Sequence, residues 1–489
     1  MNKKTILFLL AIAQGASAAS AGNAGDSSAI DQLMNAAPAA LAEQTLPEAV
    51  MAPEREIPAS RFMTGSGSEY LERPYLLPES LEMDEAGYGV YKSVPTLYRG
   101  SAVGQASFKK ELEALTGSRF TGGNSAQLLF GPDSFAMRDK LMLAAKKSIF
   151  ITAYSFHDDE TGNRLADLLI AKRRQGVDVK LIADGKVAMV SSRKLLNRME
   201  AGGVEVLRWQ EPGRLLDIWH VKMLIVDGRY SFVGGINVGD VYSHRGGGPK
   251  WQDYDVLYSG PAVTDTLNFF AREWNASLGG KRTPVVPAAA RYGAFETGSA
   301  ELSVVFQNPP HEKQILGTIL KSIYGARTRI NIAHSYFIAI PPLRDAIIDA
   351  LGRGVEVNII TNTSKSIDAE AKHAAVPIIR SLAGIYPYGA NIYLNRGENL
   401  HGKFMTVDGV FATIGSYNMH PRSEKYDSEM NVNLSGAEAV RQFDATFAGL
   451  IANAQKVEAP SDLAIPGGFV TFISNIIERY FFDMLKSPA

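Results

Sequence analysis

The sequence predicts an α/β fold made of two related halves. Residues 145–156 and 326–337 have the same texture, in which a charged helix end runs into a β-branched and aromatic strand. In both places an amphipathic helical stretch, a glycine and a second apolar strand follow. Because strand, helix and strand alternate in each copy, we expect parallel strand pairs covered by helices, and hence two similar sheets.

The helix of each copy is predicted by apolar residues at helical spacing. These residues are Leu165, Leu168 and Leu169 in the first copy and Leu343, Ile347, Ile348 and Leu351 in the second. Gly176 and Gly354 then follow as plausible C-caps, since glycine readily adopts the left-handed conformation that ends many helices. The apolar runs at 177–184 and 355–362 complete the two units as strands.

Length and composition bound the organisation of the chain. With 489 residues, of which 46% are hydrophobic, the chain is long enough for two domain-sized cores. The 50 Lys and Arg nearly cancel the 51 Asp and Glu, so no global positive field attracts a polyanion, and no nucleic-acid partner is expected. The absence of cysteine excludes disulfides, thiolate metal ligands and a cysteine nucleophile, which leaves eight histidines as the scarce reactive residues.

The two ends have their own signatures. Residues 1–18 read as a signal peptide, with lysines, a short apolar run and a small-residue cleavage site, so we expect an exported protein, periplasmic or secreted, with peripheral membrane association as one option. Residues 19–98 form an Ala/Pro-rich extension of unassigned role. Two repeats are expected at 99–290 and 291–460, followed by an amphipathic C-terminal helix at 461–489, for which packing on the core is favoured over membrane insertion.

The most specific signal is a five-residue pattern that occurs twice at a constant offset of 181 positions. The pattern comprises His220, Lys222, Asp227, Gly234 and Asn237 in the first copy and His401, Lys403, Asp408, Gly415 and Asn418 in the second. Residues i and i+2 of a strand project to the same face, so each imidazole and ammonium converge on one pocket. The Asp-Gly pairs predict hairpin turns that bring each asparagine back toward its histidine. A histidine nucleophile surrounded by cations and amide donors suits a phosphodiester.

This double His-x-Lys-x4-Asp signature resembles the phospholipase D superfamily, from about Leu97 to the C-terminus. Segments 232–239, 251–253 and 354–357 are similar to bacterial cardiolipin synthases and related phosphatidyltransferases. The resemblance implies two pseudo-twofold-related repeats, each a mixed β-sheet flanked by helices, with one shared active-site cleft. It also implies a phosphodiesterase or phosphatidyltransferase that works through a phosphohistidine intermediate.

The resemblance also assigns roles to the six catalytic-signature residues. We expect His220 to be the nucleophile and His401 the acid and base, although the pseudo-symmetry leaves their order open. Lys222, Lys403, Asn237 and Asn418 would hold the phosphate oxygens, so neither metal nor cofactor is expected. Asp227 and Asp408 are better explained as structural residues that fix the hairpins.

Two further carboxylates are expected to orient the histidines. By resemblance, Glu429 pairs with His220 and Asp253 with His401, so that each pair crosses between the halves. His334 and His420 are candidates for lining the pocket, and Trp219 and Ser416-Tyr417 are expected to shape it. The pair Arg422-Ser423 either touches phosphate or forms a turn salt bridge, and the acidic stretch 157–160 is interpreted as a surface loop rather than a metal site.

The favoured function is transfer of a phosphatidyl group from a phospholipid at a membrane surface to an acceptor, which is a small alcohol, a glycerol headgroup or water. Cardiolipin synthesis is the leading case. The alternative is a secreted phospholipase D that hydrolyses phospholipids, because water is simply another acceptor. A nuclease and a non-catalytic lipid-binding module are further alternatives, which the neutral charge and the completeness of both motifs disfavour.

Overall fold

The computed structural model describes residues 100–465, apart from residues 215, 281, 287–297, 310, 311, 313 and 370. The predicted signal peptide, the extension at 19–98 and nearly all of the predicted C-terminal helix lie outside the described residues. Residues 59–367 and 372–489 make up one unit, and the account below concerns its described part. Within that part, no helix combines the length and apolar character needed to cross a membrane.

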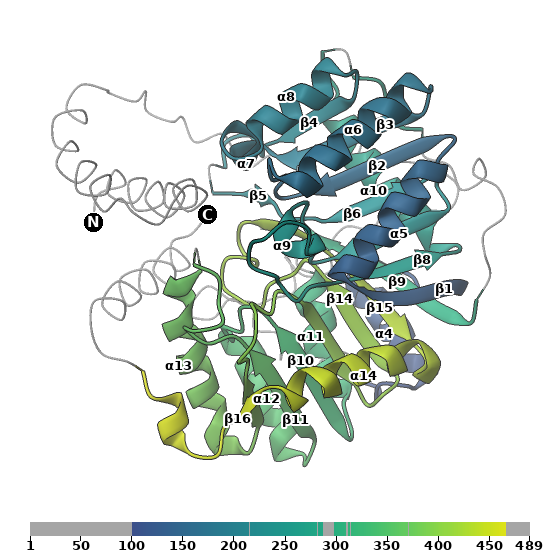
Figure 1. Cartoon of the computed structure of the whole chain (residues 1–489). Coiled ribbons are helices and arrows are strands. Elements are labelled where there is room, and N and C mark those ends of the chain that lie inside the picture. Colours follow the sequence, from purple (N-terminus) through teal and green to yellow (C-terminus); the bar gives the residue numbers. More distant parts are fainter. Residues whose placement is uncertain are drawn as a thin grey trace, which may run out of the picture. The chain divides into compact units, whose positions relative to one another are not determined.

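Strands from both halves hydrogen-bond into one continuous sheet (Figure 1). From the centre outward, the first half supplies β1 (Thr121–Phe130), β8 (Tyr254–Ser259), β7 (Tyr230–Gly234), β6 (Met223–Val226), β2 (Ser148–Ala153), β3 (Asp178–Asp184) and β4 (Glu205–Trp209). The second half supplies β9 (Ala300–Gln307), β15 (Asp427–Ser435), β14 (Phe411–Gly415), β13 (Lys403–Val407), β10 (Arg329–His334), β11 (Glu356–Thr361), β12 (Asn391–Leu394) and β16 (Gln455–Lys456). Because β1 pairs with β9, the two halves join in the middle of the sheet. From there outward, corresponding strands follow in the same order in each half.

The sheet is mixed, as the resemblance implies, but the two separate sheets that we expected are joined into one because β1 pairs with β9. Strands β2, β3 and β4 are parallel neighbours, and so are their counterparts β10, β11 and β12. Strands β6 and β13, which follow the two motif histidines, pair antiparallel with β2 and β10. The predicted strand-helix-strand units are therefore confirmed in both halves, and each unit adjoins the strand that carries its motif.

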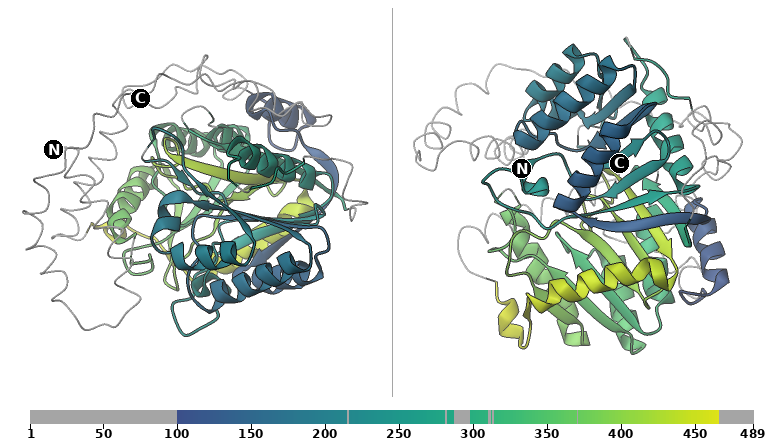
Figure 2. Two further views of the ribbon diagram at one scale, coloured as in Figure 1. Left: turned by 90° about the horizontal axis from the view of Figure 1, so that it is seen from above. Right: turned by 45° about the vertical axis from the view of Figure 1, so that its right-hand side comes forward.

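Helices cover both faces of the strands (Figure 2). In the first half, α5 (Gly131–Ala144), α6 (Glu160–Arg174) and α8 (Arg193–Ala201) pack on the face to which Ile149 and Ile151 point. Phe150 points the other way, into a core that both halves share and that contains α10 (Ala262–Ala276) and α14 (Ala437–Ala452). The remaining helices are α4 (Ala106–Thr116), α7 (Gly185–Met189), α9 (Asp240–Ser243), α11 (Gln314–Gly325), α12 (Pro341–Gly352) and α13 (Ala375–Ile385), with short 3-10 turns at Lys372–Ala374, Tyr386–Tyr388 and Pro460–Leu463.

Glycines end the first helix of each unit as predicted. Helix α6 stops at Arg174 and α12 at Gly352, and two residues later Gly176 and Gly354 have φ values of 85° and 81°. This left-handed conformation costs a residue with a Cβ atom more than it costs glycine. The chain can therefore turn directly from each helix into β3 or β11.

The two motif aspartates hold the hairpins in place. Asp227 and Asp408 begin the turns with φ values of 53° and 54°, and the glycine after each also has a positive φ, as type I′ hairpin turns require. The Asp227 carboxylate accepts hydrogen bonds from the backbone N–H groups of residues 146, 147 and 148, at 2.7 to 3.0 Å. The Asp408 carboxylate accepts from the N–H groups of residues 327, 328 and 329, at 2.8 to 2.9 Å.

Each aspartate thus connects its hairpin to the residues at the start of the neighbouring strand, β2 or β10. Because β6 separates Asp227 from His220, the aspartate lies at the opposite end of this strand from the imidazole. The structural role expected for Asp227 and Asp408 agrees with this placement.

Candidate active site

Each motif histidine is anchored by backbone of the other half. The short strand β5 (Ile218–Trp219) pairs with the start of β15, and the His220 N–H then donates to the Ser428 carbonyl oxygen at 3.0 Å. In the second half, the N–H groups of His401 and Gly402 donate to the Gln252 carbonyl oxygen at 2.8 and 3.0 Å. Neither histidine could hold this position if its own half folded alone.

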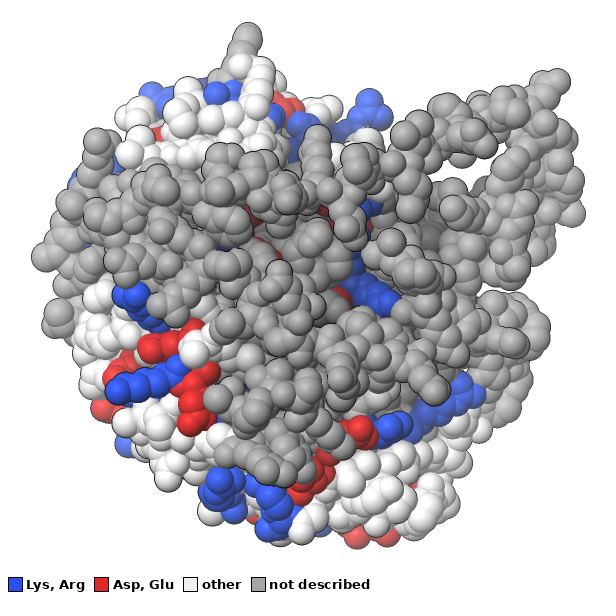
Figure 3. Space-filling view, turned by 180° about the vertical axis from the view of Figure 1, so that it is seen from behind, with Lys and Arg blue, Asp and Glu red and all other residues white. Residues whose placement is uncertain are grey.

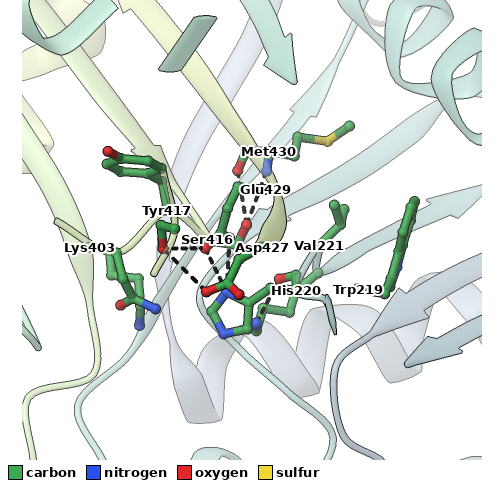
Figure 4. A network of polar contacts seen from close by, with 12 residues as sticks. Trp219, His220, Val221, Lys403, Ser416, Tyr417, Asp427, Glu429 and Met430 are labelled. Carbon is green, nitrogen blue, oxygen red and sulfur yellow. Dashed lines mark hydrogen bonds and ion pairs between the residues drawn. The ribbon is translucent and has the colours of Figure 1, made fainter. Parts of the chain in front are cut away.

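His220 pairs with Glu429 across the halves. Nδ1 of the imidazole lies 2.9 and 2.8 Å from the two carboxylate oxygens of Glu429 (Figure 4). Ser423 supports this carboxylate from behind, since its hydroxyl donates to Oε1 at 3.0 Å. With Nδ1 directed at an acceptor, the proton belongs on Nδ1 and the lone pair of the neutral ring on Nε2.

His401 has the reciprocal arrangement. Its Nδ1 lies 2.6 Å from Oδ2 of Asp253, while Oδ1 of Asp253 accepts the N–H of Tyr254 at 2.8 Å. The structure therefore brings together both crossing pairs that the resemblance implies. Both carboxylates are fully buried, and the two histidine side chains are 11% and 7% exposed.

Each motif lysine contacts the histidine that lies two positions before it in the sequence. Lys222 Nζ donates to the carbonyl oxygen of His220 at 2.7 Å, and Lys403 Nζ donates to that of His401. Lys403 Nζ also lies 3.2 Å from Nδ1 of His401. Both side chains are buried, so their positive charges are concentrated where a phosphate would need them.

The two motif asparagines are buried next to the same strand ends. Asn237 accepts the N–H of Ser155 at 3.3 Å through Oδ1 and donates to the Tyr242 hydroxyl at 3.0 Å. Asn418 accepts the hydroxyl of Ser335 at 3.4 Å. Their side chains therefore lie where the predicted hairpins were expected to return them, close to the carboxyl ends of β2 and β10.

Electrostatic interactions connect the two motifs. Burial lowers the pKa of His220 well below 6.5, and the charges of Lys222, of Lys403 and of His401 lower it further. Two of these groups belong to the other half, so the two motifs interact electrostatically. Burial lowers the pKa of Lys222 to about 7 and raises that of Asp253 to about 7.

Burial also raises the pKa of Glu429 well above its usual range, and the neighbouring Asp427 carboxylate acts in the same direction. Both shifts in the His220–Glu429 pair disfavour an ion pair, whereas the charge of Lys222 lowers the pKa of Glu429. Only an ionised Glu429 accepts the proton of Nδ1, and this state leaves the lone pair of the neutral ring on Nε2. A neutral imidazole with its lone pair on Nε2 is the form that attacks phosphorus.

Aromatic rings surround the two imidazoles unequally. The Tyr154 ring centre lies 5.5 Å from that of His220. Around His401, the corresponding distances are 5.4 Å for Tyr242, 5.2 Å for Trp251 and 6.1 Å for Tyr336. Sequence reasoning did not identify Tyr242 or Trp251 as site residues, because they lie outside the repeated pattern.

The expectation that Trp219 shapes the pocket wall is wrong. Trp219 is fully buried, stacks on Phe269 at 5.9 Å and donates through Nε1 to Thr152 Oγ1 at 3.0 Å, so it is a core residue. Ser416 and Tyr417 are also buried, and Ser416 Oγ accepts the N–H of Met430 at 3.0 Å beside Glu429 (Figure 4). Ser416 therefore lies beside the carboxylate that orients His220, and the expectation that Ser416-Tyr417 shapes the pocket stays a prediction.

The alternatives for His334, His420 and Arg422 are resolved by their contacts. His334 is buried with Nε2 3.0 Å from the Tyr417 carbonyl oxygen, which makes it a core histidine. His420 lies near the site, since its charge acts on the pKa of His220. Arg422 forms the turn salt bridge, 2.9 Å from Asp427.

The acidic stretch at 157–160 serves the fold. Asp159 caps helix α6, accepting the N–H of Gly162 at 2.9 Å. Across the described parts of 100–465, no three or more His, Asp or Glu side chains are arranged to hold a metal ion.

Comparisons with known proteins agree with this geometry. The family model described as "Cardiolipin synthase, PLD-like domain" matches residues 139–244 and 319–451. The major cardiolipin synthase ClsA of Bacillus subtilis is 30% identical over 345 residues, which cover 67% of this chain and 69% of that protein. The cardiolipin synthase of Oceanobacillus iheyensis is also 30% identical, over 315 residues; the match covers 62% of this chain and 63% of that protein, less than two thirds of its length.

A solved structure shares the fold. The phosphatidylserine synthase of Haemophilus influenzae Rd KW20 superposes with a TM-score of 0.60 at 15% identity, covering 78% of this chain and 98% of that one. The family of the chain therefore follows from the sequences of its relatives. The duplicated mixed sheet and the two crossing histidine-carboxylate pairs agree with it. The chain belongs to the cardiolipin synthase-like branch of the phospholipase D superfamily.

Proposed function

We propose that the chain is a phosphatidyltransferase that acts on phospholipid phosphodiesters, in the manner of a cardiolipin synthase. The observation that carries the proposal is the pair of buried histidines, each oriented by a carboxylate of the opposite half and each accompanied by a buried lysine. Such a site offers a nucleophile, a proton carrier and two cations to a phosphate, and none of these groups requires a cofactor.

The first step forms a bond between Nε2 of His220 and phosphorus while the bond from phosphorus to the headgroup oxygen breaks. His401 gives its proton to the leaving alkoxide. Lys222 and Lys403 hold the non-bridging oxygens as negative charge builds on them. Support comes from the lowered pKa of His220, which keeps its imidazole neutral and nucleophilic.

The second step reverses the first with a new alcohol. His401 takes the proton of the acceptor hydroxyl, the acceptor oxygen bonds to phosphorus, and the bond from phosphorus to His220 breaks. A glycerol headgroup of another phospholipid would yield cardiolipin, and water would yield phosphatidic acid. The cardiolipin synthases among the relatives favour the lipid acceptor.

Nucleic acid is disfavoured as the substrate by charge. The whole chain carries a formal net charge of −1, and on the face in Figure 3 the visible basic side chains are intermixed with acidic ones. A binder of duplex DNA gains most of its affinity from concentrated positive charge.

The test is a product analysis with purified protein and phosphatidylglycerol vesicles labelled in the acyl chain. The proposal predicts labelled cardiolipin and free glycerol, and labelled phosphatidylethanol when ethanol is added. Phosphatidic acid as the sole lipid product would establish the hydrolytic alternative. Cleavage of an oligonucleotide with no change in lipid would contradict both, and the H220A and H401A variants serve as inactive controls.

We also propose that the protein is exported, on the basis of the sequence of residues 1–18. Expression in a bacterial host and sequencing of the N-terminus test this. A mature chain that starts at Ala19 outside the cytoplasm is the expected result, and an uncleaved cytoplasmic chain would contradict it.

A further inference from the structure

An exposed apolar pair protrudes next to the His220 side of the site. Met189 ends helix α7 and Val190 follows it, and their exposed fractions are 60% and 63%. In the described part of the chain they are the only two sequence neighbours among the exposed large hydrophobic residues. Leaving two adjacent apolar side chains in water has an energetic cost that an apolar partner would remove.

Hydrogen bonds at its base connect α7 to the active site. Asp184 caps the helix through Oδ1, and its Oδ2 accepts the N–H of Trp219, the residue before His220, at 2.9 Å. Lys186 Nζ donates to the Asp217 carbonyl oxygen at 2.6 Å. The apolar pair is therefore held at a fixed place relative to the nucleophile.

Hydrogen bonds also fix the segment that follows Met189 and Val190. The hydroxyl of Ser192 accepts the N–H of Phe156 at 2.9 Å, and Phe156 is two residues from Tyr154, whose ring lies against His220. The N–H groups of Val190 and Ser192 both donate to the Val187 carbonyl oxygen at 3.1 Å. Met189 and Val190 thus form a rigid tip, which we call the α7 tip.

Basic side chains flank the α7 tip. Residues 185–199 contain four of them, and the residues on either side of this stretch are acidic: Asp184 is buried and caps α7, and Glu200 pairs with Arg208. Neighbouring elements pair with two of the four basic side chains, Asp158 with Lys194 and Asp167 with Arg198, whereas Arg193 is exposed beside the tip. Apolar side chains flanked by basic ones match the interface of an anionic bilayer, where acyl chains lie beneath negative phosphates.

We infer that the α7 tip inserts into the surface of an anionic phospholipid bilayer and holds the His220 side of the site against it. The inference rests on the proposed function, because a lipid substrate must leave the bilayer close to the nucleophile. Insertion of the tip would bring the phosphate layer to the level of the site. The α7 tip would then determine how well the enzyme acts on vesicles without touching the reacting atoms.

The experiment compares wild-type protein with M189D/V190D on vesicles of phosphatidylglycerol and phosphatidylcholine and on a short-chain phosphatidylglycerol below its micellar concentration. Vesicle binding is measured by co-sedimentation. The inference predicts at least tenfold weaker vesicle binding and a matching loss of activity on vesicles, since a charge replaces buried apolar area. Turnover of the dissolved substrate should stay within about twofold of wild type.

The matched control is L143D. Leu143 is 58% exposed on α5 and lies at the opposite end of β2, near the Asp227 hairpin. The same substitution there should leave vesicle binding unchanged. The milder M189S/V190S variant, expected to bind with intermediate strength, covers the case in which the aspartates disturb folding.

Three results would overturn the inference. Vesicle binding equal to wild type in both tip variants is the first, and an equal loss in L143D is the second. The third is a wild-type dimer that becomes monomeric in M189D/V190D without any difference in vesicle binding, since this would make the tip a contact between copies of the chain. If no protein turns over the dissolved lipid but the binding difference persists, the proposed function fails and the α7 tip still binds bilayers.

Discussion

Glu429 lies 2.8 Å from Nδ1 of His220, although 209 positions separate the two residues along the chain. The contact exists because β5 of the first half pairs with β15 of the second. Asp253 and His401 make the reciprocal contact, so each half completes the active site of the other. In the proposed mechanism catalysis therefore requires both halves, and the predictions below test parts of that arrangement.

Replacing Glu429 by glutamine should lower kcat by roughly 10² to 10⁴-fold, the scale found when a histidine loses its orienting carboxylate. The amide can donate to Nδ1, which favours the wrong tautomer and removes the lone pair from Nε2. KM should change little, because Glu429 is fully buried and contacts Nδ1, not the attacking Nε2. Steady-state kinetics on dissolved short-chain phosphatidylglycerol measure both constants.

The control for this variant is E301Q on β9, where the carboxylate makes a partly exposed ion pair with Lys109. Its kcat should equal that of wild type. An E429Q enzyme with wild-type kcat would show that orientation of His220 by Glu429 is dispensable.

The alkaline side of the pH profile should report Lys222. Burial lowers its pKa to about 7, so above that pH the free enzyme loses the ammonium charge and with it a contact to phosphate. The value of kcat/KM should therefore fall as pH rises above about 7, by up to about tenfold per pH unit. Bound phosphate favours the charged amine, so the fall in kcat should occur at higher pH.

The K222R variant tests this assignment, since a guanidinium stays charged throughout the range. Its kcat/KM should be lower at neutral pH, because the fork does not fit the lysine site, but should no longer fall between pH 7 and 9. The same alkaline fall in both proteins would assign the titration to another group.

Replacing Asp227 by alanine should lower the free energy of unfolding by about 2 to 3 kcal/mol, because three backbone N–H groups lose a charged acceptor. The residue also has a φ of 53°, which alanine adopts with strain. Asparagine tolerates this φ and keeps one acceptor oxygen, so D227N should lose less. Thermal unfolding measures both variants.

Activity of D227A should recover at low temperature in proportion to the folded fraction. A variant with the melting temperature of wild type and no activity at any temperature would instead make Asp227 a participant in the chemistry. Asp408 should behave in the same way, since its carboxylate binds the matching N–H groups of residues 327 to 329.

The sequence predicts those parts of the molecule that repeat. The offset between His220 and His401 identified both motifs, and Gly176 and Gly354 marked the helix ends, because periodicity and left-handed glycines are local properties. The pairing of Glu429 with His220 came from the family resemblance alone. No spacing rule contains it, since it depends on the packing of two halves.

The errors have the same origin. Trp219 precedes a catalytic histidine, yet it points into the core because side chains alternate along the extended segment that carries it. The α7 tip was not foreseen, since Met189 and Val190 in a helical context are more often buried than exposed. Which face of a short element meets solvent is decided by tertiary packing.

The most direct test of a single site built by two histidines is to trap the covalent intermediate. In H401A the proton donor is missing, so a donor lipid with an activated leaving group, such as a nitrophenyl phosphatidyl ester, should phosphorylate His220 without further turnover. Mass spectrometry of the acid-sensitive adduct should locate a phosphatidyl group on the peptide that contains His220, and H220A should show none. An adduct on His401 in H220A alone would reverse the two roles, and full turnover by either alanine variant would contradict the shared site itself.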